Sequence, residues 1–112
     1  MIMKFGLDKY TRDLINSVFK KYPEVNRVLI YGSRAKGNYR EGSDIDLTLV
    51  GTEIRNELLS QISNELYDLH TPYLFDVSLY DRIDSHGLKE HIERVGKVFY
   101  EKEKLLTAKV GK

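Results

Sequence analysis

The sequence predicts a single compact α/β sheet domain. Short aliphatic and β-branched runs alternate with apolar stripes of helical period, and proline and glycine residues separate them. The 112-residue chain is long enough for one hydrophobic core, and its 41% hydrophobic and 31% charged residues are the balance of an ordinary soluble domain. The net charge of +1 creates no global field that would favour a nucleic acid or a membrane.

The first half of the chain predicts a helix followed by two strands. The helix has an apolar stripe and ends before Pro23; the stripe comprises Leu7, Tyr10, Leu14, Val18 and Tyr22. The run "RVLIYG" at 27–32 predicts a short buried strand that Gly32 closes. The run "DIDLTLV" at 44–50 alternates, so Asp44, Asp46 and Thr48 share one face of a strand and apolar residues occupy the other.

The second half repeats the alternation of helix and strand. A helical stripe runs from about residue 53 to 69, and Pro72 breaks it. The run "YLFDVSLY" at 73–80 predicts a third strand that carries Asp76, a weaker helical pattern covers 88–97, and "KVFYEK" predicts a short edge strand. We expect one domain over 1–112, with the residues from about 104 frayed.

Several functional classes are excluded or disfavoured by what the sequence lacks. It has no cysteine, which excludes disulfides, thiolate zinc sites and cysteine nucleophiles. No apolar run approaches the length of a membrane span, the N-terminus does not resemble a signal peptide, and we expect a cytoplasmic location. His70, His86 and His91 lack metal-ligand spacing, and we expect surface or packing roles for them.

Three aspartates interrupt strands that are otherwise apolar. Asp44 and Asp46 lie on one face of the second strand, and Asp76 interrupts the third strand in the same way. If these strands are neighbours, three carboxylates converge, and their mutual repulsion is unfavourable unless cations bind. Mg²⁺ prefers such oxygen ligands, and two ions can support in-line phosphoryl displacement. The aspartates therefore predict a magnesium site.

A complementary anion site lies just upstream. A strand that ends at Gly32 and enters a helical turn at Ser33 presents free backbone N–H groups and a hydroxyl to a phosphate. Positive charges follow in the same segment at Arg34, Lys36 and Arg40. Each part has an ordinary structural explanation as a turn, an exposed strand or a solvated loop, but the combination within twenty residues favours a nucleotide site.

The spacing of these residues resembles a known signature. Gly32-Ser33, ten intervening residues and Asp44-Ile45-Asp46 resemble the G-S-x10-D-x-D motif of the DNA polymerase β-like nucleotidyltransferase superfamily. The stretch "GSRAKGNYREGSDIDL" resembles its minimal nucleotidyltransferase (MNT) branch, and the resemblance covers nearly the whole chain. It implies the polymerase β-like fold, a small mixed sheet of three to four strands with helices packed on one face.

The resemblance also implies roles for individual residues. Asp44 and Asp46 would bind two Mg²⁺ ions, and Asp76 would complete the metal site and help to deprotonate the acceptor. Gly32 and Ser33 would contact the phosphates of ATP, with Arg34 as a further phosphate contact.

The implied function is that of an antitoxin. MNT proteins of HEPN/MNT pairs transfer AMP from ATP to a tyrosine hydroxyl of a HEPN-domain toxin, and the chain has no visible domain for the acceptor. We therefore expect a HEPN partner in a hetero-oligomer, or a homodimer, and expect neither a nucleic acid nor a membrane partner. Two alternatives stay open: an antitoxin that acts only by binding, and an enzyme for a small hydroxylated acceptor such as an aminoglycoside.

Overall fold

A computed structural model describes residues 3–103 of the chain. It contains four α-helices, a short 3₁₀ helix and four strands within these residues. In chain order they are α1 (Lys9–Phe19), β1 (Val25–Tyr31), α2 (Gly32–Lys36), β2 (Ile45–Gly51), α3 (Asn56–Tyr67), β3 (Phe75–Leu79), η1 (Tyr80–Arg82), α4 (His86–Val95) and β4 (Lys97–Glu101). The predicted order of helices and strands is therefore confirmed, and the part of the chain expected to fray, from residue 104, lies outside the described residues.

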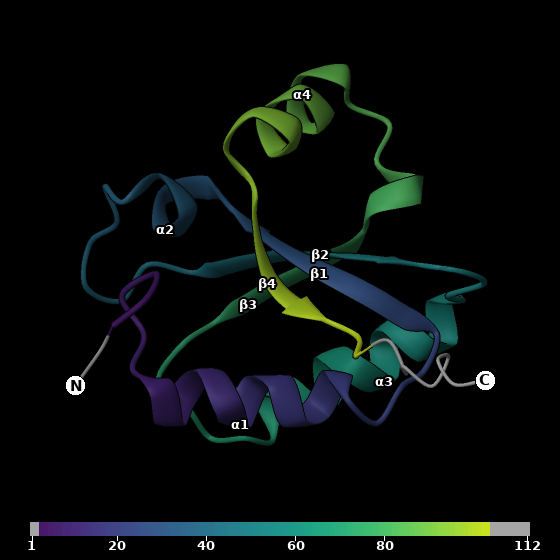
Figure 1. The fold of residues 1–112 in the computed structure, drawn as a ribbon, viewed down its shortest axis with the longest axis horizontal. Helices are drawn as coiled ribbons and strands as arrows, with labels where there is room; N and C mark the ends of the chain where they lie inside the picture. Colours follow the sequence, from purple (N-terminus) through teal and green to yellow (C-terminus); the bar gives the residue numbers. More distant parts are fainter. Residues whose placement is uncertain (1–2, 104–112) are drawn as a thin grey trace, which may run out of the picture.

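The strands form one mixed sheet in the order β3-β2-β1-β4 (Figure 1). β1 pairs antiparallel with both β2 and β4, whereas β2 and β3 are parallel. Parallel neighbours need a crossover connection, and α3 supplies it between β2 and β3. The two strands that carry the predicted carboxylates are therefore adjacent, and their equivalent ends lie side by side.

The main hydrophobic core lies between the sheet and the helices α1 and α3, which cover one of its faces (Figure 1). The alternation in β2 sends its apolar residues into this core, as predicted from the sequence. Buried members of the cluster include Ile15, Val18, Phe19, Val28, Ile30, Ile45, Leu47, Leu49, Ile62 and Leu66. This core fixes the orientation of β2, so that Asp46 must point to the opposite face.

The helix α4 lies on that opposite face (Figure 1), which corrects the expectation that all helices pack on one face. Tyr31 is the register partner of Asp46 and so shares its face, and the Tyr31 ring meets the His91 ring of α4 edge-on at 6.1 Å. Burial explains the arrangement, because Ile92 of α4 is 1% exposed and needs an apolar surface to cover it. The sheet is therefore covered by helices on both faces.

Local signals explain where two of the helices begin. The Asp8 side chain caps α1 by accepting a hydrogen bond from the Thr11 N–H, and the Ser85 side chain caps α4 in the same way from Leu88. One detail of the predicted stripe is wrong, because Tyr10 lies on the outer side of α1 and is 73% exposed. No helix within residues 3–103 has the length and apolar character needed to cross a membrane.

Candidate active site

The turn from β1 into α2 requires a glycine at its first residue. Gly32 has a positive φ of 74°, a conformation that side chains disfavour. A Cβ atom at this position would also lie 2.4 Å from the Asp46 Oδ2 atom. Gly32 therefore allows the predicted phosphate turn to approach the carboxylate of β2, and Ser33 follows it at the start of α2.

The structure brings the predicted carboxylates to the end of the sheet where β2 and β3 begin, next to this turn. Asp46 and Asp76 are register partners on the parallel strands β2 and β3, so both side chains leave the sheet on the same face. Asp44 lies one residue before β2 rather than inside the strand, and it is exposed. Asp76 is also exposed, on the edge strand, whereas Asp46 is partly buried.

The electrostatics of this group favour binding of a cation. Burial, as the largest cause, together with the negative charges of Asp76 and Asp44, raises the pKa of the Asp46 carboxyl from its ordinary value to about 6. Within residues 3–103 none of the three carboxylates forms a hydrogen bond or an ion pair, which leaves their oxygen atoms available. Carboxylate oxygens with free lone pairs are the ligands that Mg²⁺ takes.

The carboxylates do not form a complete metal cage. In the part of the chain that the structure describes, no three acidic or histidine side chains lie close enough together to hold an ion by themselves. Mg²⁺ commonly binds through one or two carboxylates and completes its coordination with water and substrate phosphates. The donor set therefore fits Mg²⁺ that arrives together with a nucleotide.

Arg34 is placed differently from the simplest expectation of a phosphate contact. Its side chain is 3% exposed, and its guanidinium donates to the main-chain carbonyl oxygens of Ser43 and Phe5. Lys36 and Arg40 are exposed, so they are the cations of this segment that are open to a ligand. A phosphate contact by Arg34 would compete with these hydrogen bonds to main-chain carbonyls.

His91 has a role that the sequence did not indicate. Its Nε2 atom accepts a hydrogen bond of 3.2 Å from the Gly32 N–H, which requires that nitrogen to be unprotonated. One N–H of the predicted phosphate turn is therefore already engaged by α4. Only the position of α4 on the acidic face reveals this contact, because the two residues lie 59 positions apart in the chain.

The neighbouring Tyr31 completes this side of the site. Burial raises the pKa of its hydroxyl, and the charges of Asp76 and Asp46 act in the same direction, while a hydrogen bond with Ser78 opposes them. Tyr31 therefore stays a neutral phenol beside the acidic pair at neutral pH.

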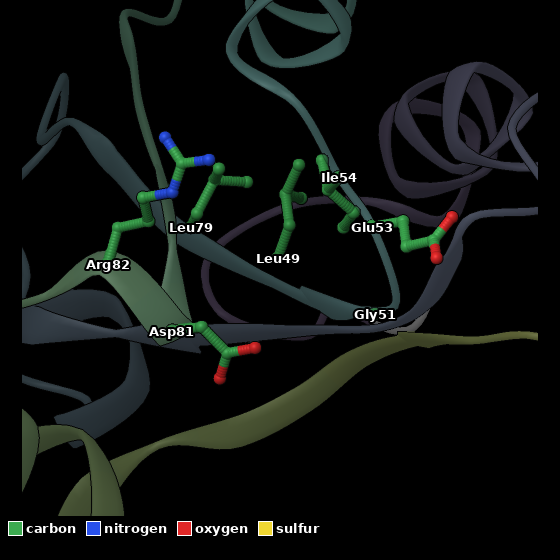
Figure 2. A pocket seen from close by; sticks show the side chains of 7 residues that line it. All are labelled: Leu49, Gly51, Glu53, Ile54, Leu79, Asp81 and Arg82. Carbon is green, nitrogen blue, oxygen red and sulfur yellow. The ribbon is translucent and has the colours of Figure 1, made fainter.

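A separate cavity of about 200 Å³ lies at the other end of β2 and β3 (Figure 2). Its apolar side chains, Leu49, Ile54 and Leu79, lie between Arg82 on one side and Glu53 on the other (Figure 2). Gly51, which also lines it, ends β2 five residues beyond Asp46, about 16 Å along the strand. This cavity is therefore distinct from the acidic edge and contains none of the predicted site residues.

Comparison with known proteins identifies the family of this chain. Residues 13–105 match the model of the family described as Polymerase beta, Nucleotidyltransferase. The chain belongs to this nucleotidyltransferase family. The match includes the turn, all three aspartates and every strand of the sheet.

Individual relatives cover different parts of the chain. A protein of Methanocaldococcus jannaschii named putative protein adenylyltransferase is 36% identical over 45 residues, which span 39% of this chain and 45% of the relative. A crystal structure of a toxin–antitoxin with AMP-PNP matches with a TM-score of 0.67 and 17% identity, over 82% of this chain and 74% of that chain.

A second solved structure contains a tri-AMPylated HEPN toxin of Shewanella oneidensis in complex with an MNT antitoxin. It matches with a TM-score of 0.63 and 14% identity, over 84% of this chain and 72% of that chain. At these identities the structural matches establish the fold of this chain.

Proposed function

We propose that this nucleotidyltransferase transfers AMP from ATP to a tyrosine hydroxyl of a partner protein, and that it acts as the antitoxin of a HEPN-domain toxin. The observation that carries the proposal is the in-register pair Asp46 and Asp76 beside the Gly32 turn. The M. jannaschii relative named as an adenylyltransferase and the fold shared with an MNT antitoxin support the choice of reaction and partner.

One group of site residues would bind the phosphates of ATP, and a second group would bind the metal ions. The Ser33 hydroxyl and the backbone N–H groups at the start of α2 would hold the triphosphate, with Lys36 and Arg40 contributing positive charge. Asp44, Asp46 and Asp76 would hold two Mg²⁺ ions. When bound, these ions would neutralise the charge on the phosphates and on the departing pyrophosphate.

The transfer itself makes one bond and breaks one bond. The tyrosine oxygen forms a bond to the α-phosphorus of ATP, and the bond from that phosphorus to the bridging oxygen of the β-phosphate breaks. Pyrophosphate leaves with the electron pair, and the Asp76 carboxylate accepts the phenol proton. Exposure of Asp76 on the edge strand suits this role, because a protein-borne hydroxyl can approach it.

Intact-mass measurement of the partner tests the proposal. The purified chain is mixed with a candidate HEPN-domain partner, ATP and Mg²⁺, and we expect the partner to gain one or more AMP units. Asp46→Asn should slow this gain by about 100-fold or more, because loss of metal binding removes several kcal/mol of transition-state stabilisation. Asp68→Asn is the matched control, since it removes an exposed carboxylate at the end of α3.

The same experiment separates the alternatives. If the toxin gains no mass and Asp46→Asn still neutralises it, the chain acts by binding and the proposal is wrong. AMP transfer to an aminoglycoside, with none to the HEPN protein, would instead identify an enzyme for small hydroxylated acceptors.

A further inference from the structure

The burial of Arg34 needs an explanation. Its side chain is 3% exposed, and within residues 3–103 no other charged residue is buried to this degree. Burying a charge is costly unless polar groups replace the lost water. The groups that contact the Arg34 guanidinium therefore indicate its structural role.

The guanidinium is bound by main-chain carbonyls and by two aromatic rings. Its Nε and Nη2 atoms both donate to the Ser43 carbonyl oxygen, at 3.0 and 2.9 Å, and its Nη1 atom donates to the Phe5 carbonyl oxygen at 2.8 Å. The rings of Tyr39 and Tyr73 lie 5.1 and 4.9 Å from its central carbon, within the range of cation–π contacts. These contacts use the planar fork that distinguishes arginine from lysine.

The Ser43 carbonyl belongs to the peptide bond that leads into Asp44. Arg34 itself lies in α2, two residues after Gly32. One side chain therefore connects the predicted phosphate turn to the residue that precedes the first predicted metal ligand. It spans the loop between α2 and β2, whose residues from Lys36 to Gly42 are all exposed and have little other packing to hold them.

The N-terminal segment closes over the same guanidinium. Gly6 has a positive φ of 74°, and a Cβ atom there would lie 2.7 Å from the Arg34 Nη1 atom and 2.6 Å from the Tyr39 ring. The segment is held in place by paired backbone hydrogen bonds between Lys4 and Leu7. Gly6 is therefore a position from which Arg34 can be displaced without changing Arg34 itself.

We propose that Arg34 is a positioning residue for the metal site. By holding the Ser43 carbonyl, it fixes the entry into β2 and places the Asp44 carboxylate beside Asp46 before a metal arrives. The consequence for metal binding rests on the proposed function, whereas the effect on the loop does not.

Two variants test this role from opposite sides. Arg34→Lys keeps the charge but loses the fork, and Gly6→Ala pushes a methyl group against the guanidinium. Gly37→Ala is the matched control, because Gly37 also has a positive φ, of 90°, but has nothing within 4 Å of the position of a Cβ. Thermal unfolding establishes that each variant is folded, and if Arg34→Lys fails to fold, Gly6→Ala decides.

The first readout is hydrogen exchange of the metal-free protein over residues 37–45. We expect exchange to be faster by about 10-fold or more in Arg34→Lys and in Gly6→Ala, which corresponds to the loss of one charged hydrogen bond. In Gly37→Ala, the amides that are not adjacent to position 37 should exchange at rates within a factor of about two of those in the original chain. Unchanged exchange in both test variants would overturn the proposal, whether or not the chain transfers AMP.

The second readout is Mn²⁺ binding, measured by electron paramagnetic resonance in the presence of α,β-methylene ATP. This analogue cannot donate AMP, because a methylene group replaces the oxygen between its α- and β-phosphates. We expect the Kd for Mn²⁺ to rise by about 10-fold or more in the two test variants, as when a group that orients a metal ligand is lost. Nucleotide affinity without metal should remain close to that of the original chain. Loss of this metal-free affinity with unchanged loop exchange would make Arg34 a phosphate contact and overturn the positioning role.

If the original chain binds neither the nucleotide analogue nor Mn²⁺, the proposed function fails. Loop exchange then still decides whether Arg34 holds the entry into β2.

Discussion

Replacing Asp46 by asparagine should make the metal-free protein more stable at neutral pH, although it should slow AMP transfer by about 100-fold or more. The cause is the raised pKa of this carboxyl, about 6 in the folded chain against an ordinary value of 3.8. Burial, Asp76 and Asp44 all disfavour its charged form, and asparagine removes that charge with little change of shape.

The sign and size of the effect follow from proton linkage. Because the folded state holds the proton more tightly than the unfolded state, ionisation of Asp46 favours unfolding. The penalty is absent below about pH 4 and complete above about pH 6, so this residue makes stability fall as the pH rises through that window. The full shift corresponds to about 3 kcal/mol, and solvent access to the half-buried carboxylate reduces this to about 1–2 kcal/mol.

Urea unfolding in EDTA at several values between pH 4 and pH 7.5 measures this difference. The free energies of unfolding of Asp46→Asn and the original chain should be similar near pH 4 and should differ by about 1–2 kcal/mol at pH 7. Asp68→Asn, which removes an exposed carboxylate, should follow the original chain. A less stable Asp46→Asn protein at pH 7, or one with the original pH dependence, would refute the electrostatic reasoning.

Three further changes have separable effects. Gly32→Ala should cost more than about 2 kcal/mol in urea unfolding and should abolish AMP transfer, since its methyl group meets Asp46, whereas Gly37→Ala should cost only about 1 kcal/mol for its positive φ. Asp76→Asn should lower the rate of AMP transfer, measured by intact mass, by about 100-fold or more. It should not lower the free energy of unfolding, because Asp76 is exposed and its charge disfavours the ionised form of Asp46. Leu47→Ala, at a fully buried position of β2, should lower the free energy of unfolding in urea by about 2–5 kcal/mol. For each of the three variants, a result outside the stated range would contradict the contact on which the prediction rests.

The part of the site that is local in sequence was predictable. The turn at Gly32 and the acidic face of β2 lie within one short segment, and alternation determines which side chains leave the core. The neighbour of β2 was not determined in this way, because alternation gives the face of a strand but not its partner. Asp76 meets Asp46 only because α3 returns the chain to a parallel position beside β2.

The contacts of Arg34 and His91 were beyond sequence reasoning for a related reason. An arginine in a polar, glycine-bearing segment looks like a solvated charge, and its burial depends on the distant Phe5 and on the carbonyl of Ser43. His91 reaches Gly32 only because α4 covers the acidic face of the sheet. Both contacts join a side chain to a backbone group of another segment. Contacts of this kind produce no hydrophobic periodicity from which they could be predicted.

The position of Asp76 on an edge strand has a consequence for selectivity. Among the described strands, β3 has a neighbour on one side only, and Asp76 is exposed. Under the proposed function, this chain holds ATP and supplies the carboxylates that bind metal and accept the proton, whereas docking of the partner decides which hydroxyl reaches the α-phosphorus. Discrimination between acceptors would then be a ratio of docking affinities rather than the fit of a side chain in a pocket. A tyrosine fused to any domain that binds this edge would become a substrate.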